Sequence, residues 1–247
     1  MLRTKTRLIP NCVTCLNLLC GCMAVICAFS PTARMCGLFG YQATFIFILA
    51  GAAADFLDGF MARLLKAYSP LGADLDSLSD LITFGLAPAL LLWNLFALSP
   101  APEWLKWAVL LIPLCGALRL ARFNVDPSQS TVFRGLPIPS CALFCIGLAD
   151  IMVSATGFNP YATFGCVIFI ALMMVSPLPM LSLKFHGFGL SSVNNVMRYL
   201  LLAIAAACIA IWHWTGFLIA ICVYILFSFF SLVFIAESDT DHQSDKS

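Results

Sequence analysis

Five of the twelve acidic residues in this chain lie within one stretch of 26 residues, which runs from Asp55 to Asp80. Asp55 and Asp58 are three residues apart and Asp76 and Asp80 are four apart, so each pair lies on one face of a helix. A Ser-Pro dipeptide between the pairs predicts a turn, which makes the two helices antiparallel neighbours. Both carboxylate pairs are therefore expected to converge at one end of these helices.

The side chains in this stretch suit a hard divalent cation and an anionic ligand. Four carboxylates supply the oxygen ligands that Mg²⁺, Mn²⁺ and Ca²⁺ prefer, and they do not suit zinc or copper. Gly59 and Ala62 leave room for a ligand on the same helical face, and Arg63 offers a positive charge to an anion. The fifth acid, Asp74, is expected to face solvent. Together these residues indicate a phosphate-binding site.

The composition indicates that this site belongs to a membrane protein. Of 247 residues, 62% are hydrophobic and only 10% are charged, whereas a soluble domain carries about 25% charged residues. The net charge of +1 provides no basic surface, so no nucleic-acid partner is expected. A carboxylate inside a bilayer costs about 2.5–3.5 kcal/mol, so four of them require cations and an aqueous cavity.

Long apolar runs recur along the chain, and most approach the roughly 20 residues that span a bilayer. They predict an all-α, polytopic membrane protein with about eight transmembrane helices. We interpret residues 1–236 as a single integral-membrane domain and residues 237–247 as a short acidic tail without fixed structure. The predicted helices cover residues 11–30, 41–65, 71–98, 103–124, 137–156, 160–182, 195–213 and 216–236.

The charged residues predict how the protein is oriented. An even number of spans places both termini on one side, and every lysine and arginine except Arg34 and Lys106 falls on that side. The positive-inside rule then assigns both termini and the acidic stretch to the cytosol. The five tryptophans fall near the opposite helix ends, where a belt of interfacial aromatic residues is expected.

The acidic stretch resembles the signature of the CDP-alcohol phosphotransferase family. The matching pattern is Asp55-x-x-Asp58-Gly59-x-x-Ala62-Arg63, then eight residues, Gly72, three residues, Asp76, three residues and Asp80, with every fixed position filled. Five other segments are similar to one branch of that family, the bacterial-type phosphatidylserine synthases. They are IPNCVTCLNLLCG from Ile9, DSLSDLITFGLAPALL from Asp76, RLARFN from Arg119, FRGLPIP from Phe133 and VSPLPMLSLK from Val175.

The resemblance implies an enzyme that transfers the phosphatidyl group from CDP-diacylglycerol to the hydroxyl of L-serine, giving phosphatidylserine and CMP. It implies six core helices around a cytosolic cavity, and a homodimer among the lipids of a bacterial-type inner membrane. It also implies that Asp55, Asp58, Asp76 and Asp80 hold two divalent metals. These would be Mg²⁺ or Mn²⁺, with Ca²⁺ as a further candidate. Asp76 and Asp80 are the expected catalytic residues, with Asp80 as the base for the serine hydroxyl.

The same pattern indicates which residues bind the two substrates. The residues expected to flank the cytidine diphosphate are Asp58, Gly59, Ala62, Arg63 and Gly72. Thr14 and Asn17, one turn apart on the first helix, either contact the nucleotide or form hydrogen bonds between helices. Arg119, Arg122 and Lys184 are candidates to hold the carboxylate of serine, because an arginine side chain can bind a carboxylate through two parallel hydrogen bonds.

Three other functions fit parts of the sequence. Glycerol 3-phosphate or an inositol phosphate could replace serine as the acceptor in the same reaction. A cation-coupled transporter also places acids and glycines in membrane helices, but near the midplane and within inverted repeats, and the sequence shows no repeat. A lipid-binding scaffold would keep the anionic site without needing a base. Asp150, in the fifth predicted helix, is expected to serve helix packing or the path of the acceptor.

Overall fold

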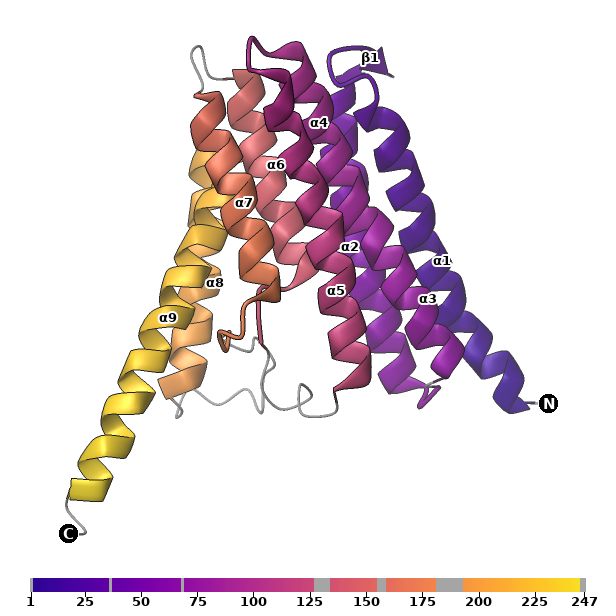
Figure 1. Cartoon of the computed structure of the whole chain (residues 1–247). Coiled ribbons are helices and arrows are strands. Elements are labelled where there is room, and N and C mark those ends of the chain that lie inside the picture. Colours follow the sequence, from indigo (N-terminus) through magenta and orange to yellow (C-terminus); the bar gives the residue numbers. More distant parts are fainter. Residues whose placement is uncertain are drawn as a thin grey trace.

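The computed structural model describes residues 2–35, 37–67, 69–126, 134–154, 159–180 and 193–244. These residues form a bundle of helices that run up and down its long axis (Figure 1). A π-helical turn, η1, joins α3 to α4, and a 3₁₀ helix, η2, leads into α5. The helices are α1 (Leu2–Ala28), α2 (Gly40–Leu64), α3 (Pro70–Asp80), η1 (Leu81–Leu86), α4 (Ala87–Leu98), η2 (Glu103–Leu110), α5 (Leu111–Val125), α6 (Ile138–Ser154), α7 (Pro160–Val175), α8 (Val193–Trp212) and α9 (Thr215–Ser244).

The ends of the helices follow local sequence signals. α3 begins after Ser69, whose hydroxyl accepts a hydrogen bond from the Gly72 amide at 3.0 Å. α7 begins after Asn159, which caps the helix in the same way, and a proline follows each cap at the first helical position. α7 ends at Val175, short of the predicted residue 182, because Pro177 and Pro179 have no amide hydrogen to continue it.

The lengths of the helices support the expected all-α membrane protein. Among the described residues, four segments are long and apolar enough to cross a membrane, namely Pro10–Ala28, Gly40–Leu64, Pro70–Leu98 and Glu103–Val125. The shorter apolar helices are Ile138–Ser154, Pro160–Val175, Met197–Trp212 and Thr215–Phe230. Large apolar side chains point outward from the bundle, as lipid contact requires. The protein is therefore an integral membrane protein built from helices.

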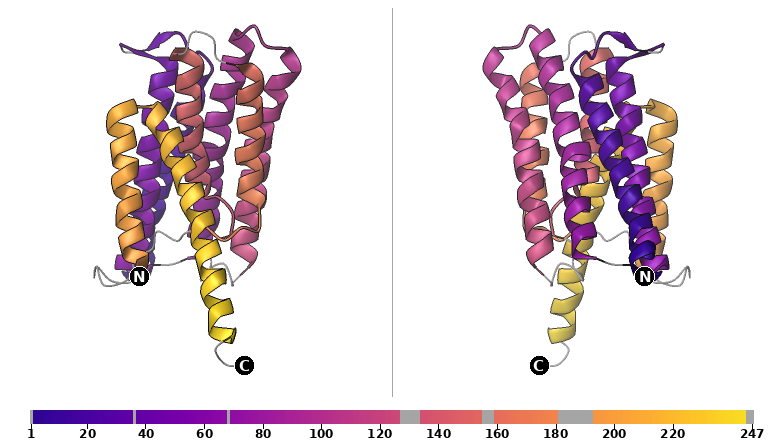
Figure 2. Two further views of the ribbon diagram at one scale, coloured as in Figure 1. Left: turned by 90° about the vertical axis from the view of Figure 1, so that its left-hand side faces the viewer. Right: turned by 90° about the vertical axis from the view of Figure 1, so that its right-hand side faces the viewer.

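The core of the bundle surrounds α4. α4 packs against α1, α2, η2 and α6, and its Leu91 and Leu92 are almost fully buried. Buried Phe45 and Ile48 of α2 belong to the same hydrophobic cluster. α8 and α9 form a hairpin that joins the bundle where α9 packs against α6 (Figure 2). α9 continues through residues 237–244, where the sequence predicted a tail without fixed structure.

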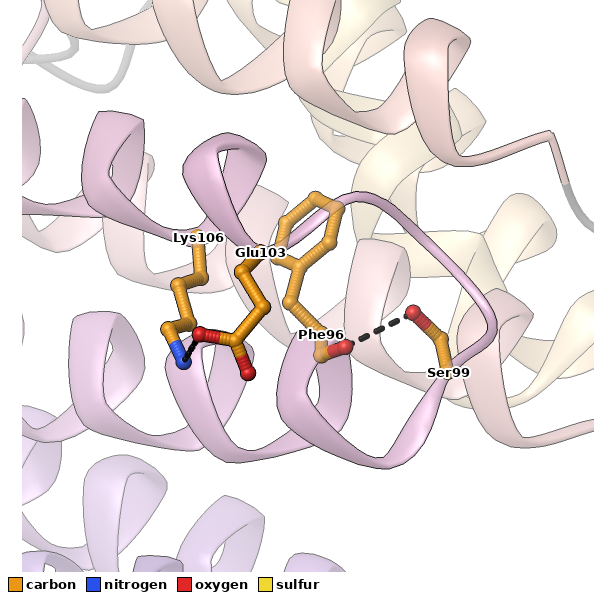
Figure 3. Close-up of polar contacts among 4 residues, drawn as sticks. All are labelled: Phe96, Ser99, Glu103 and Lys106. Carbon is orange, nitrogen blue, oxygen red and sulfur yellow. Dashed lines mark hydrogen bonds and ion pairs between the residues drawn. The ribbon is translucent and has the colours of Figure 1, made fainter.

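The two ends of the bundle differ in character. The α2–α3 connection lies at the same end as both chain termini (Figure 1), and we call this the aspartate end. The opposite end carries a small antiparallel hairpin of β1 (Arg34–Met35) and β2 (Leu38–Phe39), which the all-α prediction did not include. Lys106 forms a 3.1 Å ion pair with Glu103 there, and the Ser99 hydroxyl closes the end of α4 by donating to the Phe96 carbonyl at 2.7 Å (Figure 3).

The tryptophans lie at the opposite end, as the sequence predicts. Trp93 near the end of α4 and Trp107 in η2 meet edge to face, with ring centroids 4.7 Å apart. Trp104 in η2 packs on α7 through Phe164, and Trp212 and Trp214 flank the α8–α9 turn. Aromatic residues concentrate in this way where a bundle meets the membrane–water interface.

Candidate metal and phosphate site

Three aspartates from two helices converge at the aspartate end. Asp55 on α2 and Asp76 and Asp80 on α3 each place one carboxylate oxygen within 4.8 Å of the other two. α1 packs against both α2 and α3, so it holds the two helices in place while their carboxylates face each other. The predicted convergence of the two pairs is thus found for these three side chains.

The fourth aspartate, Asp58, lies one helical turn from Asp55. It is only 7% exposed, and its Oδ2 atom has no hydrogen-bond partner among the described residues. Within the same residues, the Oδ1 atom of Asp76 is also buried without a partner. We refer to Asp55, Asp58, Asp76 and Asp80 as the aspartate cluster.

The environment of the aspartate cluster fits a divalent cation. In the described part of the chain, no lysine or arginine lies at ion-pair distance from any of these four side chains. Buried carboxylate oxygens without partners are costly in a helical membrane protein, and several in one place call for cations. An all-oxygen set of ligands is the type that hard divalent metals bind.

A cavity of about 210 Å³ adjoins the aspartate cluster. Both Asp58 and Asp76 line it, so the carboxylates and the cavity form one continuous site. Five of the predicted donor-binding residues line this cavity, namely Thr14, Asp58, Gly59, Ala62 and Gly72. A Cβ atom added at Gly59 would meet only the Arg63 guanidinium, at 3.9 Å, so the missing side chain leaves open space beside the aspartates.

Asn11 also lines this cavity, although the sequence analysis did not select it as a site residue. A Cβ atom at Gly72 would come within 3.0 Å of the Asn11 Oδ1 atom. The small residue therefore allows α3 to approach α1 closely. A polar residue directly after Pro10, at the entry to an apolar helix, was the signal that could have indicated Asn11.

Two predicted donor-binding residues do not line the cavity. Asn17 is fully buried, and its Nδ2 atom donates a 3.1 Å hydrogen bond to Oδ1 of Asp80. The structure thus favours the alternative of a hydrogen bond between helices for Asn17. Arg63 is exposed, and its Nε atom donates to the Gly59 carbonyl at 2.9 Å on its own helix.

The π-helical turn η1 fixes Asp80 at the end of α3. Three residues after Asp80, Thr83 enters the space between α1 and α2, where its hydroxyl donates to the Asn17 carbonyl at 3.1 Å. A Cβ atom at Gly21 or Gly51 would overlap Thr83, so the two glycines form the notch that receives it. π turns are rare and often lie at functional sites. Here the turn holds Asp80 against Asn17.

A second cavity, of about 620 Å³, is lined by three arginines and by one acidic residue, Asp126. Arg119 and Arg122 come from α5, as predicted, and Arg134 comes from the segment that precedes α6. We call this cavity the arginine pocket. Arg134 was not among the predicted site residues, although it lies in the quoted FRGLPIP segment. Lys184 lies outside the described residues.

The arginines of this pocket have capacity for a ligand. Arg119 is only 9% exposed, and in the part of the chain that the structure describes its Nε atom has no hydrogen-bond partner. It also interacts electrostatically with Asp80. Arg122 donates from Nη1 to the Val175 carbonyl at 3.3 Å, which leaves its other N–H groups for a ligand. The arginine pocket therefore suits an anion and lies beside the aspartate cluster.

The wall of the arginine pocket depends on a close contact at Gly135. Its φ of +75° favours glycine, and a Cβ atom there would overlap the Met174 carbonyl. The Gly135 amide donates to the Leu178 carbonyl at 2.9 Å, and the Leu136 amide donates to the Met173 carbonyl at 3.0 Å. These contacts hold Arg134 at the end of α7.

Comparisons with known proteins agree with this geometry. The model of the CDP-alcohol phosphatidyltransferase family matches residues 7–236. The chain is 33% identical to a CDP-diacylglycerol–serine O-phosphatidyltransferase of Bacillus subtilis (strain 168) over 179 residues, which cover 72% of this chain and 93% of the relative. It is 31% identical to a protein of the same name from Mycobacterium leprae over 215 residues, 83% of this chain and 68% of the relative. A third, from Methanocaldococcus jannaschii, is 36% identical over 146 residues, 59% of this chain and 62% of the relative.

Proposed function

This chain belongs to the CDP-alcohol phosphatidyltransferase family, and we propose that it transfers the phosphatidyl group of CDP-diacylglycerol to L-serine. The products are phosphatidylserine and CMP. The observation that carries the proposal is the aspartate cluster, whose unpartnered oxygens open onto a cavity lined by small residues. This arrangement suits a diphosphate held through divalent metals.

The aspartate cluster is the part of the chain that would hold the metals. The family uses divalent metals, and we propose two ions per site, Mg²⁺ or Mn²⁺, with Ca²⁺ as another candidate. When bound, they neutralise the diphosphate and the charge that develops on the leaving group.

The donor is bound by the residues around the 210 Å³ cavity. Gly59, Ala62 and Gly72 let the cytidine diphosphate approach the helix backbones, and Thr14 offers a hydroxyl from α1. Arg63, at the exposed rim, adds a positive charge for the phosphates. The acyl chains would lie along outward apolar residues such as Phe56 and Leu71, which are 67% and 70% exposed.

Asp80 is the proposed base. Asn17 engages its Oδ1 atom, so the proton of the serine hydroxyl would pass to Oδ2. The serine oxygen then bonds to the lipid-side phosphorus, the bond from that phosphorus to the bridging oxygen breaks, and CMP leaves with the electron pair. A base held in one orientation by a buried hydrogen bond is ready for this transfer without rearrangement.

The arginine pocket is the proposed site of serine. Its carboxylate would be held by Arg119 and Arg122, with Arg134 as a third cation on the same cavity. Lys184 remains a proposed contact outside the described residues. Asn124 donates from Nδ2 to the Ser77 hydroxyl at 2.9 Å, which ties α5 to α3. The two substrate sites are thereby held in register.

The orientation and assembly are also part of the proposal. We place both termini, the aspartate cluster and the arginine pocket on the cytosolic side of a bacterial-type inner membrane, as the distribution of basic residues favours. We further propose a single domain over residues 1–236 that works as a homodimer among membrane lipids.

A CMP-release assay tests the proposed reaction. Purified protein is supplied with CDP-diacylglycerol, a divalent metal and one of three acceptors, namely L-serine, glycerol 3-phosphate or inositol phosphate. We expect CMP release to require serine. Activity with glycerol 3-phosphate and none with serine would refute the proposed acceptor. Transport of a cation without CMP release would refute the proposed enzymatic function.

A further inference from the structure

The carboxylate of Asp150 lies in the half of the bundle away from the aspartate cluster, near the end of α6. It is the one charged residue of α6. Its Oδ2 atom accepts a 2.7 Å hydrogen bond from the Thr215 hydroxyl, and its Oδ1 atom accepts one of 3.5 Å from the Ser154 hydroxyl. No described lysine or arginine lies at ion-pair distance from it. Two neutral hydroxyls orient the carboxylate and leave its charge without a cation.

This carboxylate lines a cavity of about 620 Å³ between the end of α6 and the α8–α9 turn. Most of the other lining side chains are large and aromatic or can donate hydrogen bonds. They are Ser154, Ile209, Trp212, His213, Trp214 and Phe217. The cavity shares no lining residue with the donor cavity or the arginine pocket, so the catalytic reaction does not account for it.

The aromatic wall of this cavity is held in place by neighbouring helices. The ring of Trp214 packs against Phe45 of α2, with ring centroids 5.2 Å apart, and stacks on Phe217, with ring centroids 6.3 Å apart. His213 has a φ of +51°, in the left-handed region, and the Gly216 amide donates to its carbonyl at 3.1 Å. Trp212 is 50% exposed, so one face of the cavity is open.

The chemistry of these residues selects a cation. An unpaired carboxylate attracts an ammonium group, and tryptophan is the aromatic residue that best accepts a cation on its face. A primary ammonium can also donate hydrogen bonds to the carboxylate, whereas a quaternary ammonium has no N–H group to donate. The indole N–H groups and His213 are donors for an anion attached to the same ligand. A group with a primary ammonium beside a phosphate matches both features.

We propose that this cavity binds the headgroup of a zwitterionic phospholipid that carries a primary ammonium. Charge complementarity at Asp150 and the open aromatic wall support a lipid as the source. Outward apolar residues beside the cavity, such as Ile211, which is 64% exposed, provide a surface for acyl chains. The proposal does not depend on the proposed reaction, because the two cavities share no lining residue and the α2–α3 connection and the α8–α9 turn lie in different halves of the bundle (Figure 1).

Calorimetric titration with short-chain lipids tests this site. The full-length protein in detergent is titrated with phosphatidylethanolamine, phosphatidylcholine, phosphatidylglycerol or free ethanolamine. We expect saturable binding that is tightest for phosphatidylethanolamine, and about tenfold weaker after Asp150→Asn, which keeps an acceptor oxygen but removes the charge. Trp212→Leu should weaken it severalfold. Equal binding of phosphatidylglycerol would overturn the ammonium claim, and ethanolamine binding as tight as the lipid would overturn the lipid claim.

Two control variants separate the cavity from other roles of these residues. Thr215→Val removes the hydroxyl but leaves the charge, so lipid binding should remain within about twofold while thermal stability falls. Asp74→Asn removes an exposed charge at the aspartate end and should leave lipid binding unchanged. If Asp150→Asn does not fold, Trp212→Leu decides, because this half-exposed residue is not required by the core. Unchanged binding in that variant would overturn the proposal.

Discussion

The aspartate cluster and the arginine pocket lie side by side but are built in different ways. The four aspartates come from two helices joined by one short turn, and helical spacing alone aligns each pair. The arginine pocket takes two side chains from α5 and one from the segment before α6, and it is closed by the end of α7. The first site is local in the sequence, whereas the second exists only when distant segments pack together.

In the proposed function, the aspartate cluster acts on the diphosphate and the arginine pocket selects the acceptor. Both sites contain buried polar atoms without a hydrogen-bond partner among the described residues. These are oxygens of Asp58 and Asp76 in the aspartate cluster and Nε of Arg119 in the arginine pocket. Changes among the aspartates should therefore affect catalysis with any acceptor. Changes in the arginine pocket should affect serine alone. The comparison can be tested in order of expected effect.

The largest effect is expected from the loss of a metal-binding carboxylate. Asp55→Asn or Asp76→Asn should lower turnover by about a hundredfold or more, because it weakens the hold on the diphosphate and its charge. Removal of divalent metals with EDTA should abolish CMP release. Asp74→Asn is the matched control, since Asp74 lies two residues from Asp76 but is exposed. Full activity in metal-free buffer would contradict the role of the cluster.

Asp80→Asn should separate catalysis from donor binding. Asparagine keeps the shape and one oxygen but cannot take the proton of serine, and general bases contribute about 10²–10⁴-fold. We expect kcat to fall by that amount while equilibrium binding of CDP-diacylglycerol persists. Parallel loss of donor binding and activity would mean that Asp80 acts mainly as a metal ligand and that the base lies elsewhere.

Asn17→Ala should have a smaller effect of the same kind. It removes the hydrogen bond that orients Asp80, and losing a partner of this type typically costs about 10–100-fold in activity or metal affinity. Asn94 is the matched control, because it also bridges to α1, donating to the Ala28 carbonyl at 2.9 Å, but lies far from the aspartates in α4. Asn94→Ala should lower thermal stability without a selective fall in kcat. Identical kinetic profiles for the two variants would reduce Asn17 to a packing residue.

The same contrast explains what the sequence could predict. Apolar runs and helical spacing were enough to predict the helices, the position of the tryptophans at one end and the convergence of the aspartates, because each of these depends on short-range periodicity. They could not show that Thr83 of the π turn enters a notch formed by Gly21 and Gly51, since that contact joins segments that are distant in the sequence. For the same reason the sequence left open whether Asn17 contacts the nucleotide or forms a hydrogen bond between helices, and the structure shows its bond to Asp80.

Residues outside regular helices were harder to predict. Arg134 precedes α6 in a segment without periodicity. It is placed in the pocket by backbone pairing with Pro179 and by the hydrogen bonds from the Gly135 and Leu136 amides to carbonyls at the end of α7 and just beyond it. Pro177 and Pro179 indicated that α7 ends at Val175, but the apolar residues Leu178, Met180 and Leu181 led to a longer predicted helix. A contact between loops distant in the sequence leaves no local pattern from which to infer it.

The smallest effect is expected from Arg122→Lys, which keeps the charge. The guanidinium donates to the Val175 carbonyl at 3.3 Å and still has N–H groups for a carboxylate, whereas a lysine ammonium cannot form the same planar pair of bonds. We expect KM for serine to rise severalfold while KM for CDP-diacylglycerol stays constant. Arg34→Lys, at the opposite end of the bundle, is the control and should change neither constant.

Variants of Arg119 and Arg122 together test whether the arginines of α5 bind serine. Arg119→Lys should raise KM for serine more than Arg122→Lys, because Arg119 is almost fully buried and its Nε atom has no other partner. Serine kinetics indistinguishable from wild type for both variants and for the double variant would remove these arginines from the acceptor site. Arg134 and Lys184 would then be the cations to test. The contrast with the aspartate cluster would be sharper still, since the acceptor would be held entirely by segments outside the long helices.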